Sequence, residues 1–556
     1  MDEKRLIIAI VLSVLVFVIW QFFFVDKEAI KKSDQKQPTT PVTKEAPVSE
    51  TPYVKDKEKP GVTEKSVTPV DVERPQKIAK TITVETPLYR LKISEQGAVF
   101  NSYVLKDYRE KVEKNSALKE LLAADSSLET VKLGFSGKSI PDLDKAVYLT
   151  EPNLDTLTVS ESPQKLTFYW ESNNGIKIEK IFNFSPDTYL IGFVVNIKNG
   201  SDQTIQGQLT LALRGAVPKE TRMYGFEGPS ALINNKVEEI KIKKIEEQST
   251  YNGNLKWIAI QDRYFMSSII SQNGEEASMK LSLNPTDIIE AQYVQPEKII
   301  RPGTQHQFDY YLFFGPKSMR VLGNAGHDLK EAVNFGWFHI IAKYCLLLMN
   351  FLYDIIPNYG VAIIILTVLI KIILWPLGSK SYKSMSEMKK IQPLMKEIRE
   401  KYKDDKKKMN QEVMALYKTY KINPLGGCLP MVVQIPVFFA LYRMLYQAIE
   451  LRHAPFFLWI NDLSAPDRLF RFGFSIPFME PPYGIPVLTL VMGATMLLQQ
   501  KMSPPMGDPT QAKMMMLMPI VFTVIFINFS SGLVLYWLVN NILSIAQQYY
   551  IQKKFA

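Results

Sequence analysis

The chain has 556 residues and a formal net charge of +10, from 66 Lys and Arg residues against 56 Asp and Glu residues. Its long apolar runs are confined to the first 25 residues and to the part after about residue 335, which excludes a purely soluble protein. Two cysteines and four histidines without ligand spacing exclude a disulfide-stapled scaffold and argue against a metal site.

Residues 1–28 are predicted to form an N-terminal signal-anchor span. Residues 6–25 are apolar over a length that crosses a bilayer, Lys4 and Arg5 precede them, and no small-residue cleavage site follows. Residues 29–77 are rich in Lys, Glu, Thr, Val and Pro and have Tyr53 as their only aromatic residue. Such a composition cannot bury enough surface to fold, so it predicts a disordered linker.

Residues 78–320 are predicted to form one large β-sandwich. The segment consists of short runs in which apolar and polar residues alternate, such as KLTFYWESNNGIKIEKIFNF at 165–184, without intervening helical patterns. The turn residues SNNG at 172–175 and KNGS at 198–201 each predict a hairpin between neighbouring strands.

Five apolar segments, at about 360–378, 425–447, 484–501, 513–529 and 532–551, predict a five-span core over residues 359–556. The loop at 379–423 carries 13 Lys and Arg residues against six acidic ones, which places it in the cytoplasm with the N-terminus. An even number of crossings must then precede this loop. We therefore interpret the apolar stretch in residues 321–358 as an amphipathic helix on the outer face. The prediction is six spans with both termini in the cytoplasm.

Within the cytoplasmic loop, residues 380–422 are predicted to form a helical hairpin. Two apolar seams at helical spacing, one on each side of 404–408, predict a short antiparallel coiled coil with basic outer faces. Its surface would suit RNA, anionic lipid or apolar peptides. The residues predicted to contact a substrate or a ribosome are Met385, Met388, Lys389, Lys390, Met395, Lys406, Lys407 and Lys408.

Lys371 lies near the middle of the first span of the core. A charge at that depth costs about 2.5–3.5 kcal/mol, so it is retained where it faces a hydrated cavity or a partner. The alternative is a lysine whose stem reaches one membrane surface. Thr367 lies one turn earlier on the same face, and Gln434 lies between Pro430 and Pro436 in the next span.

The last span carries a polar stripe that includes Tyr536, Asn540, Ser544 and Gln547, beside Trp537. Single polar residues in spans more often join helices than form a functional site. Three spans whose polar groups converge on one ammonium predict a hydrated groove instead. The predicted substrate-groove residues are Lys371, Thr367, Gln434, Tyr536, Trp537 and Asn540.

Several function classes are disfavoured. The six predicted spans contain no Asp or Glu, which argues against ion-coupled transport. The sequence contains no phosphate-binding loop of the kind that would indicate nucleotide use. The predicted spans contain no Ser–His, Cys–His or H-E-x-x-H pattern of the kind that would indicate a protease within the membrane. We expect a protein that is not an enzyme and that uses no cofactor, metal or nucleotide.

The C-terminal part of the chain resembles the YidC-type membrane protein insertases. The resemblance is carried in order by TVLIKIILWPLGSKSYKSMSEMKKIQPLMKEI (367–398), INPLGGCLPMVVQIPVFFALYRML (422–445), ELRHAPFFLWINDLSAPD (450–467) and FSSGLVLYWLVNNILSIAQQ (529–548). NPLGGCLP followed by QIPVF is highly specific. The N-terminal anchor, linker and β-domain match the Gram-negative form of that family, whose periplasmic domain is a β-supersandwich.

The resemblance implies a multi-pass protein of the bacterial inner membrane that inserts and folds nascent membrane proteins as an insertase and chaperone. It would work alone or with the Sec translocon and its accessory subunits, through a positively charged hydrophilic groove. The ribosome, by way of the hairpin, and anionic phospholipids are further expected partners. Lys371 stands where the family usually has arginine, so the charge is kept and the bidentate geometry is lost.

Two other functions stay open at this point. The chain would be a periplasmic sugar or glycan receptor if the β-domain does the work on a passive bundle. It would be a solute transporter if it carried a small molecule across the membrane of sealed vesicles. Transporters of this kind usually have internal repeats, and the sequence has no convincing repeat. Deletion of most of residues 80–310 separates the first alternative from an insertase, which should keep its function.

Overall fold

The computed structural model describes residues 79–555 except 123–127, 138–139, 141–142, 219–224, 273, 275, 421–428 and 504–508. The predicted signal anchor and linker lie outside these residues. Residues 79–318, named the β-domain from here on, are built almost entirely of strands. The strands are β1 (Thr81–Glu85), β2 (Tyr89–Ser94), β3 (Val99–Arg109), β4 (Leu118–Glu120), β5 (Lys132–Phe135), β6 (Leu149–Glu151), β7 (Thr156–Thr158), β8 (Gln164–Glu171), β9 (Ile176–Phe184), β10 (Leu190–Asn199), β11 (Ile205–Gly207), β12 (Leu209–Ala216), β13 (Gly228–Ile233), β14 (Lys236–Glu239), β15 (Thr250–Gln261), β16 (Phe265–Ser271), β17 (Glu276–Asn284), β18 (Ile288–Val294), β19 (Lys298–Ile300) and β20 (Gln305–Pro316).

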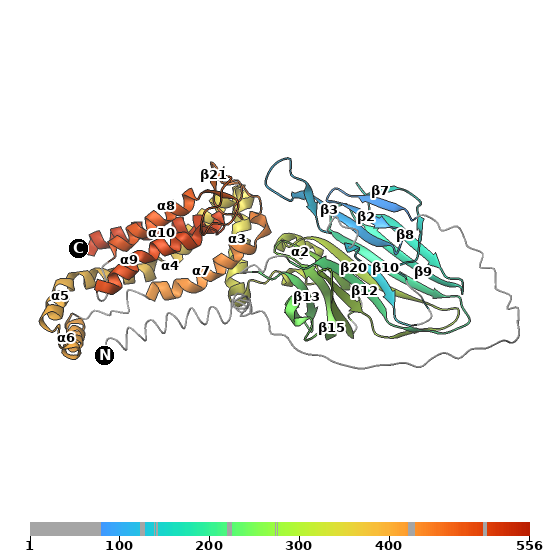
Figure 1. Ribbon diagram of the computed structural model, residues 1–556, viewed down its shortest axis with the longest axis horizontal. Coiled ribbons are helices and arrows are strands. Elements are labelled where there is room, and N and C mark those ends of the chain that lie inside the picture. The colour runs from blue at the N-terminus through green and yellow to red at the C-terminus, as the bar shows by residue number, and fades with distance from the viewer. Residues whose placement is uncertain are drawn as a thin grey trace, which may run out of the picture. The chain divides into compact units, whose positions relative to one another are not determined.

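Two large sheets form the β-domain (Figure 1). The smaller has the strand order β4-β3-β2-β1-β7. The larger has the order β5-β12-β18-β17-β15-β16-β20-β10-β9-β8-β6, with β13 joining β14 and β15. The prediction of a large, mostly β domain is confirmed.

The strands form where apolar and polar residues alternate, because successive side chains point to opposite faces of a sheet. In β9 every second residue from Ile176 to Phe184 is buried. Aromatic side chains of β3 join the two sheets: the ring centroids of Phe100 and Phe182 are 5.5 Å apart, and those of Tyr103 and Phe314 are 5.1 Å apart. Part of the core of the β-domain therefore lies between the two sheets.

One of the two predicted hairpins is present. SNNG joins β8 and β9, which pair antiparallel. The hairpin predicted at KNGS is wrong, because β10 pairs with β9 and β20 while the next strand, β11, pairs with β19. The buried Asn199 side chain redirects the chain by donating to the carbonyl oxygens of Gln203 (2.7 Å) and Ile300 (2.9 Å).

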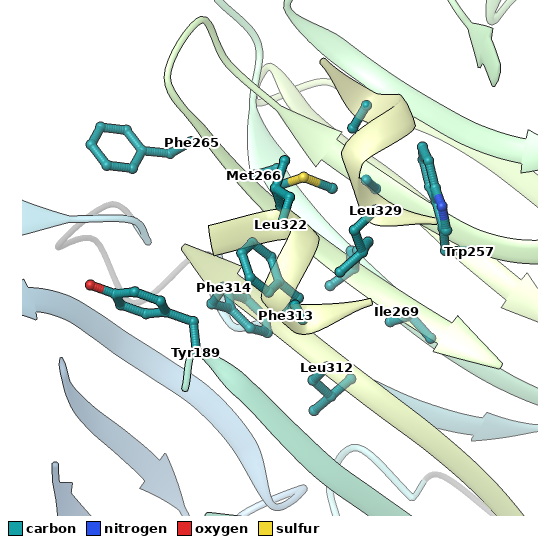
Figure 2. Close-up of a cluster of buried hydrophobic side chains, with 14 of the residues drawn as sticks. Tyr189, Trp257, Phe265, Met266, Ile269, Leu312, Phe313, Phe314, Leu322 and Leu329 are labelled. Atoms are coloured by element: carbon teal, nitrogen blue, oxygen red, sulfur yellow. The ribbon is translucent and has the colours of Figure 1, made fainter. Parts of the chain in front are cut away.

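Short helices cover one end of the core where the β-domain leads into the helical part. These are α2 (Met319–Ala325) and the 3₁₀ turn η3 (Leu329–Ala332). Figure 2 shows Leu322 and Leu329 among strand side chains that include Met266, Phe313 and Trp257. This apolar contact seals the sheet at that end.

The β-domain also buries one lysine completely. Lys180 occupies an inward-facing position of β9 and is 0% exposed. Its ammonium donates to the carbonyl oxygen of Gly97 and lies 4.8 Å from the ring centroid of Tyr148. Gly97 has φ +68°, and a Cβ there would lie 2.7 Å from the carbonyl oxygen of Asp144, so this close approach requires glycine.

The C-terminal part is helical, and its helices occupy all five segments predicted as spans of the core. The remaining elements are η4 (Gly336–Phe338), α3 (His339–Ile355), α4 (Tyr359–Lys390), α5 (Gln392–Lys401), α6 (Lys406–Thr419), α7 (Leu429–Gln447), η6 (Ile449–Leu451), β21 (Leu469–Phe472), β22 (Tyr483–Ile485), α8 (Val487–Met502), α9 (Pro509–Phe526) and α10 (Ser531–Phe555). By length and composition, residues 336–355 and Tyr359–Lys390 could each cross a membrane, and Met514–Phe526 is a shorter apolar helix.

The bundle is organised around α10, which packs against α4, α7 and α8. Asn358 starts α4 by accepting a hydrogen bond from the backbone N–H of Val361 (3.1 Å). Gly493 lets α8 approach α9 closely, since a Cβ there would lie 2.2 Å from Thr523 Oγ1. Figure 1 shows α3 running across the direction of α4, α7 and α10 at one end of the bundle.

Candidate functional site

A chain of polar contacts runs between α4, α7 and α10. The ammonium of Lys371 on α4 donates to the hydroxyl oxygen of Ser544 on α10 at 2.6 Å. The Ser544 hydroxyl donates in turn to the Asn540 carbonyl oxygen at 2.7 Å. Gln434 on α7 donates to Asn540 Oδ1 at 3.1 Å, and Tyr536 shares a side-chain hydrogen bond with Gln434. Four of the predicted groove residues thus belong to one connected set, named the polar cluster from here on.

The environment of the polar cluster is mixed. Lys371 is half-buried and Ser544 is buried. Among the residues that the structure describes, no carboxylate acts on the Lys371 ammonium. The charge is therefore held by a neutral hydroxyl in a largely apolar bundle, where electrostatic attraction to an incoming anion is stronger than in water.

The other two predicted groove residues lie elsewhere. Thr367 is buried, and its hydroxyl donates to the carbonyl oxygen of Ile363 in its own helix at 2.6 Å. Trp537 packs in an aromatic group, with its ring centroid 4.6 Å from that of Phe438 and 4.8 Å from that of Phe526. In this structure, Thr367 and Trp537 are packing residues beside the polar cluster.

The predicted site left out two residues that extend the polar cluster. Tyr382 and Gln499 are hydrogen-bonded through their side chains, and Tyr382 is also hydrogen-bonded to Ser544. Gln547 of the α10 stripe instead donates from Nε2 to the Trp375 carbonyl oxygen of α4 at 3.0 Å. Tyr382 lies about three helical turns after Lys371 and so on nearly the same face, which is the signal that could have found it.

The predicted hairpin residues lie on α4, α5 and α6. Met385, Met388, Lys389 and Lys390 form the end of α4, since that helix continues unbroken to Lys390, while Met395 lies on α5. Met388 and Met395 are buried with Ile391 against side chains of α6. They face the neighbouring helix, whereas the side chains of Lys389, Lys390, Lys407 and Lys408 are exposed. Lys406 begins α6.

The chain matches two protein-family models over most of its length. Residues 351–556 match the model described as 60Kd inner membrane protein, and residues 81–348 match the YidC periplasmic domain. The membrane protein insertase YidC of Syntrophus aciditrophicus is 42% identical over 99% of this chain and 100% of its own length. This chain belongs to the YidC family of membrane protein insertases.

A second curated relative agrees with the family. The membrane protein insertase YidC of Syntrophobacter fumaroxidans is 39% identical over 99% of this chain and 100% of its own length. A crystal structure of an active YidC insertase with its first transmembrane domain resolved is 18% identical, with a TM-score of 0.37 over 85% of this chain and 93% of that chain. YidC proteins are inner-membrane insertases with a periplasmic domain, so the β-domain of this chain is periplasmic.

Proposed function

We propose that this chain inserts and folds nascent inner-membrane proteins through a hydrated groove around the polar cluster. The observation that carries the proposal is the Lys371 ammonium, which bonds to the neutral hydroxyl of Ser544 at 2.6 Å and is not acted on by a carboxylate of the described residues. Such a charge attracts acidic residues in the segment of a substrate that must cross the membrane. A lysine supplies this attraction without the fork of an arginine.

The polar cluster would lower the cost of bringing a hydrophilic segment part of the way into the bilayer. Gln434, Asn540 and Tyr536 offer donors and acceptors to backbone groups that lipid cannot satisfy. The apolar segment of the substrate would then leave sideways into lipid, driven by its own favourable transfer. No nucleotide, metal or covalent step is needed, and the chain would not act as an enzyme.

The proposed topology has six spans, with both termini in the cytoplasm and α3 on the periplasmic surface. Ile340, Tyr344 and Phe351 of α3 are 71%, 68% and 60% exposed and lie along one helical stripe. The orientation of α3 across the bundle in Figure 1 also supports an interfacial helix. The basic region after α4 then lies in the cytoplasm.

The helices α5 and α6 would form the cytoplasmic hairpin that first meets the substrate. The exposed lysines at the end of α4, Lys389 and Lys390, and at the start of α6, Lys407 and Lys408, support contact with a ribosome or with anionic phospholipids. Met388 at the end of α4 and Met395 of α5 would hold these two helices against α6. We also propose that the chain acts alone on small substrates and with the Sec translocon and its accessory subunits on larger ones.

The test is insertion by the purified full chain in sealed liposomes without Sec components or ATP. A short membrane protein with an acidic tail is synthesised in the presence of the vesicles, and protection of its tail from added protease is measured. Lys371→Ala should lower protection about tenfold or more, because charges about 4 Å apart at an effective dielectric of 20 attract by about 4 kcal/mol. Lys371→Arg should keep protection.

Lys380 provides a matched control, since it lies on the same helix but its side chain is exposed. Lys380→Ala should leave protection unchanged. A substrate whose acidic tail residues are replaced by amides should lose its dependence on Lys371. Full protection with Lys371→Ala would contradict the charge mechanism, and no protection with the unaltered chain would contradict autonomous insertion.

A further inference from the structure

Three bulky apolar residues in the segment between α7 and α8 combine backbone strain with exposure. Leu458, Phe470 and Phe478 have φ angles of 59°, 56° and 63°. Their side chains are 86%, 67% and 81% exposed. Large residues rarely adopt the left-handed region, and such outliers persist where the surrounding structure determines them. Exposure of these apolar side chains to water is unfavourable, so their exposure needs an explanation.

The segment is fixed to the turn between α9 and α10. Arg468 donates to the carbonyl oxygens of Pro482 and Ile527, each at 2.8 Å. The side chain of Asn528 donates to the Phe478 carbonyl oxygen at 3.0 Å and accepts from the Glu480 backbone N–H at 2.9 Å. The exposed residues are therefore carried by hydrogen-bonded backbone that is tied to the ends of two helices of the bundle.

Contacts with the β-domain place this segment on the periplasmic side. Arg452 donates to the Arg109 carbonyl oxygen at 2.5 Å, and Arg471 forms an ion pair with Glu113 at 2.9 Å. Both partners lie at or just beyond the end of β3 in the periplasmic domain. The segment therefore meets the bundle where the membrane surface facing the periplasm must lie.

The neighbouring helix surfaces are also apolar and exposed. Leu490 and Val491, near the start of α8, are 51% and 46% exposed, and Val524 and Ile525, near the end of α9, are 40% and 50% exposed. In an inner-membrane protein these helix surfaces face lipid or other membrane segments. The segment that carries the exposed residues therefore leads directly into a helix whose own exposed side chains near its start are apolar.

We propose that Leu458, Phe470, Phe474 and Phe478 form an apolar anchor that inserts into the periplasmic leaflet of the bilayer. Phe474 is 64% exposed and is stacked on Phe472 at a centroid distance of 5.2 Å. The anchor fixes the depth of the α7–α8 segment in the membrane and, through Asn528, the height of the α9–α10 turn. It acts independently of Lys371 and of the insertion reaction.

The depth of single side chains in the bilayer tests this proposal. The full chain, with Cys345→Ser and Cys428→Ser, receives one cysteine as Phe470→Cys or Phe478→Cys, which is labelled with bimane. It is reconstituted into phosphatidylcholine and phosphatidylglycerol vesicles with nitroxide lipids of two depths. Ile299→Cys in β19 is the matched control, because Ile299 is an apolar side chain of the β-domain that is 63% exposed.

Bimane at 470 and 478 should be quenched by the lipid nitroxides and should report a depth of about 5–10 Å at the headgroup boundary. Bimane at 299 should be quenched by aqueous iodide only. Iodide quenching at 470 and 478 equal to that at 299, without quenching by lipid, would overturn the proposal. A surface that binds only a protein partner would give quenching by iodide without quenching by lipid, because these vesicles contain no other protein.

A second set of variants separates anchoring from folding. Asparagine tolerates the left-handed region and is polar, so Leu458→Asn, Phe470→Asn and Phe478→Asn together preserve the backbone while removing the apolar surface. In detergent this variant should unfold at the same temperature as the unaltered chain. Bimane at Phe474→Cys should then lie nearer the aqueous phase than it does without the three substitutions. An unchanged depth would overturn the anchor.

Discussion

The buried Lys180 makes the stability of the β-domain depend on pH in a defined direction. Burial lowers the pKa of Lys180 from 10.5 to about 7, although the charge of Asp144 opposes this change. The folded domain therefore releases the Lys180 proton at a lower pH than the unfolded chain does. Stability rises wherever the unfolded state binds more protons, so it should increase from about pH 7 towards about pH 10.5.

The size of the effect follows from the same two values. Each pH unit in this window contributes at most about 1.4 kcal/mol, so stability should rise by about 2 kcal/mol between pH 7 and pH 9. Lys180→Met keeps an unbranched side chain and removes the charge. Its unfolding free energy should lack this rise, while the loss of the hydrogen bond to Gly97 costs about 1–3 kcal/mol at every pH.

The assay is urea unfolding of residues 79–333, which keep α2 and η3 on the core, followed by tryptophan fluorescence from pH 6 to pH 9 once a single cooperative transition is established. Lys177→Met is the matched control, because Lys177 lies on the same strand and its side chain is 52% exposed beside Glu171. This control should keep the slope of the unaltered domain. Parallel pH profiles for the unaltered domain and Lys180→Met would refute the reasoning and show that the folded domain keeps Lys180 charged.

Two further substitutions test the packing of the helical part by thermal unfolding in detergent. Asp467 is buried, accepts a hydrogen bond from Trp459 Nε1 at 2.6 Å and caps the first turn of α8. Asp467→Ala should therefore lower the free energy of unfolding by about 1–3 kcal/mol. An unchanged unfolding temperature would show that the cap is dispensable. Gly493→Val should separate α8 from α9, because even a Cβ would lie 2.2 Å from Thr523 Oγ1, at a cost of about 1–3 kcal/mol. Gly473→Ala has open space at its Cβ and should be neutral, and equal effects at both glycines would contradict close helix packing at Gly493.

In the described part of the chain, period and composition predicted most of the strands and the apolar helices, because these elements bury a face that their own sequence defines. Strand β9 follows an alternation that is visible in the residues, and α4 follows a continuous apolar run. Lys180 shows the limit of this reasoning. Alternation alone puts it on the inward face, but a lysine there would be expected to turn to water. Its hydrogen bond to Gly97 depends on a distant turn.

The polar cluster was predictable in part as a set of residues, without Tyr382 and Gln499, and not as a set of contacts. Lys371 and the α10 stripe stand out because they are polar in apolar runs. The contact between Lys371 and Ser544, and the isolation of Thr367 on its own helix, depend on how α4 and α10 are rotated against each other. Local sequence does not specify that rotation, since it is set by packing across the whole bundle.

The continuous helix α4 connects the polar cluster at Lys371 with the proposed cytoplasmic hairpin of α5 and α6. Its 32 residues form a rod about 48 Å long that carries Lys371 in its interior and ends at Lys390, where the α5–α6 pair begins. A displacement of α5 and α6 would therefore tilt or rotate α4 at the position of Lys371. Pro376 supplies no backbone N–H within this rod, so bending concentrates near it. The stiffness of the helical turn at Pro376 would then determine how much of a movement of α5 and α6 in the cytoplasm changes the position of the Lys371 ammonium in the membrane.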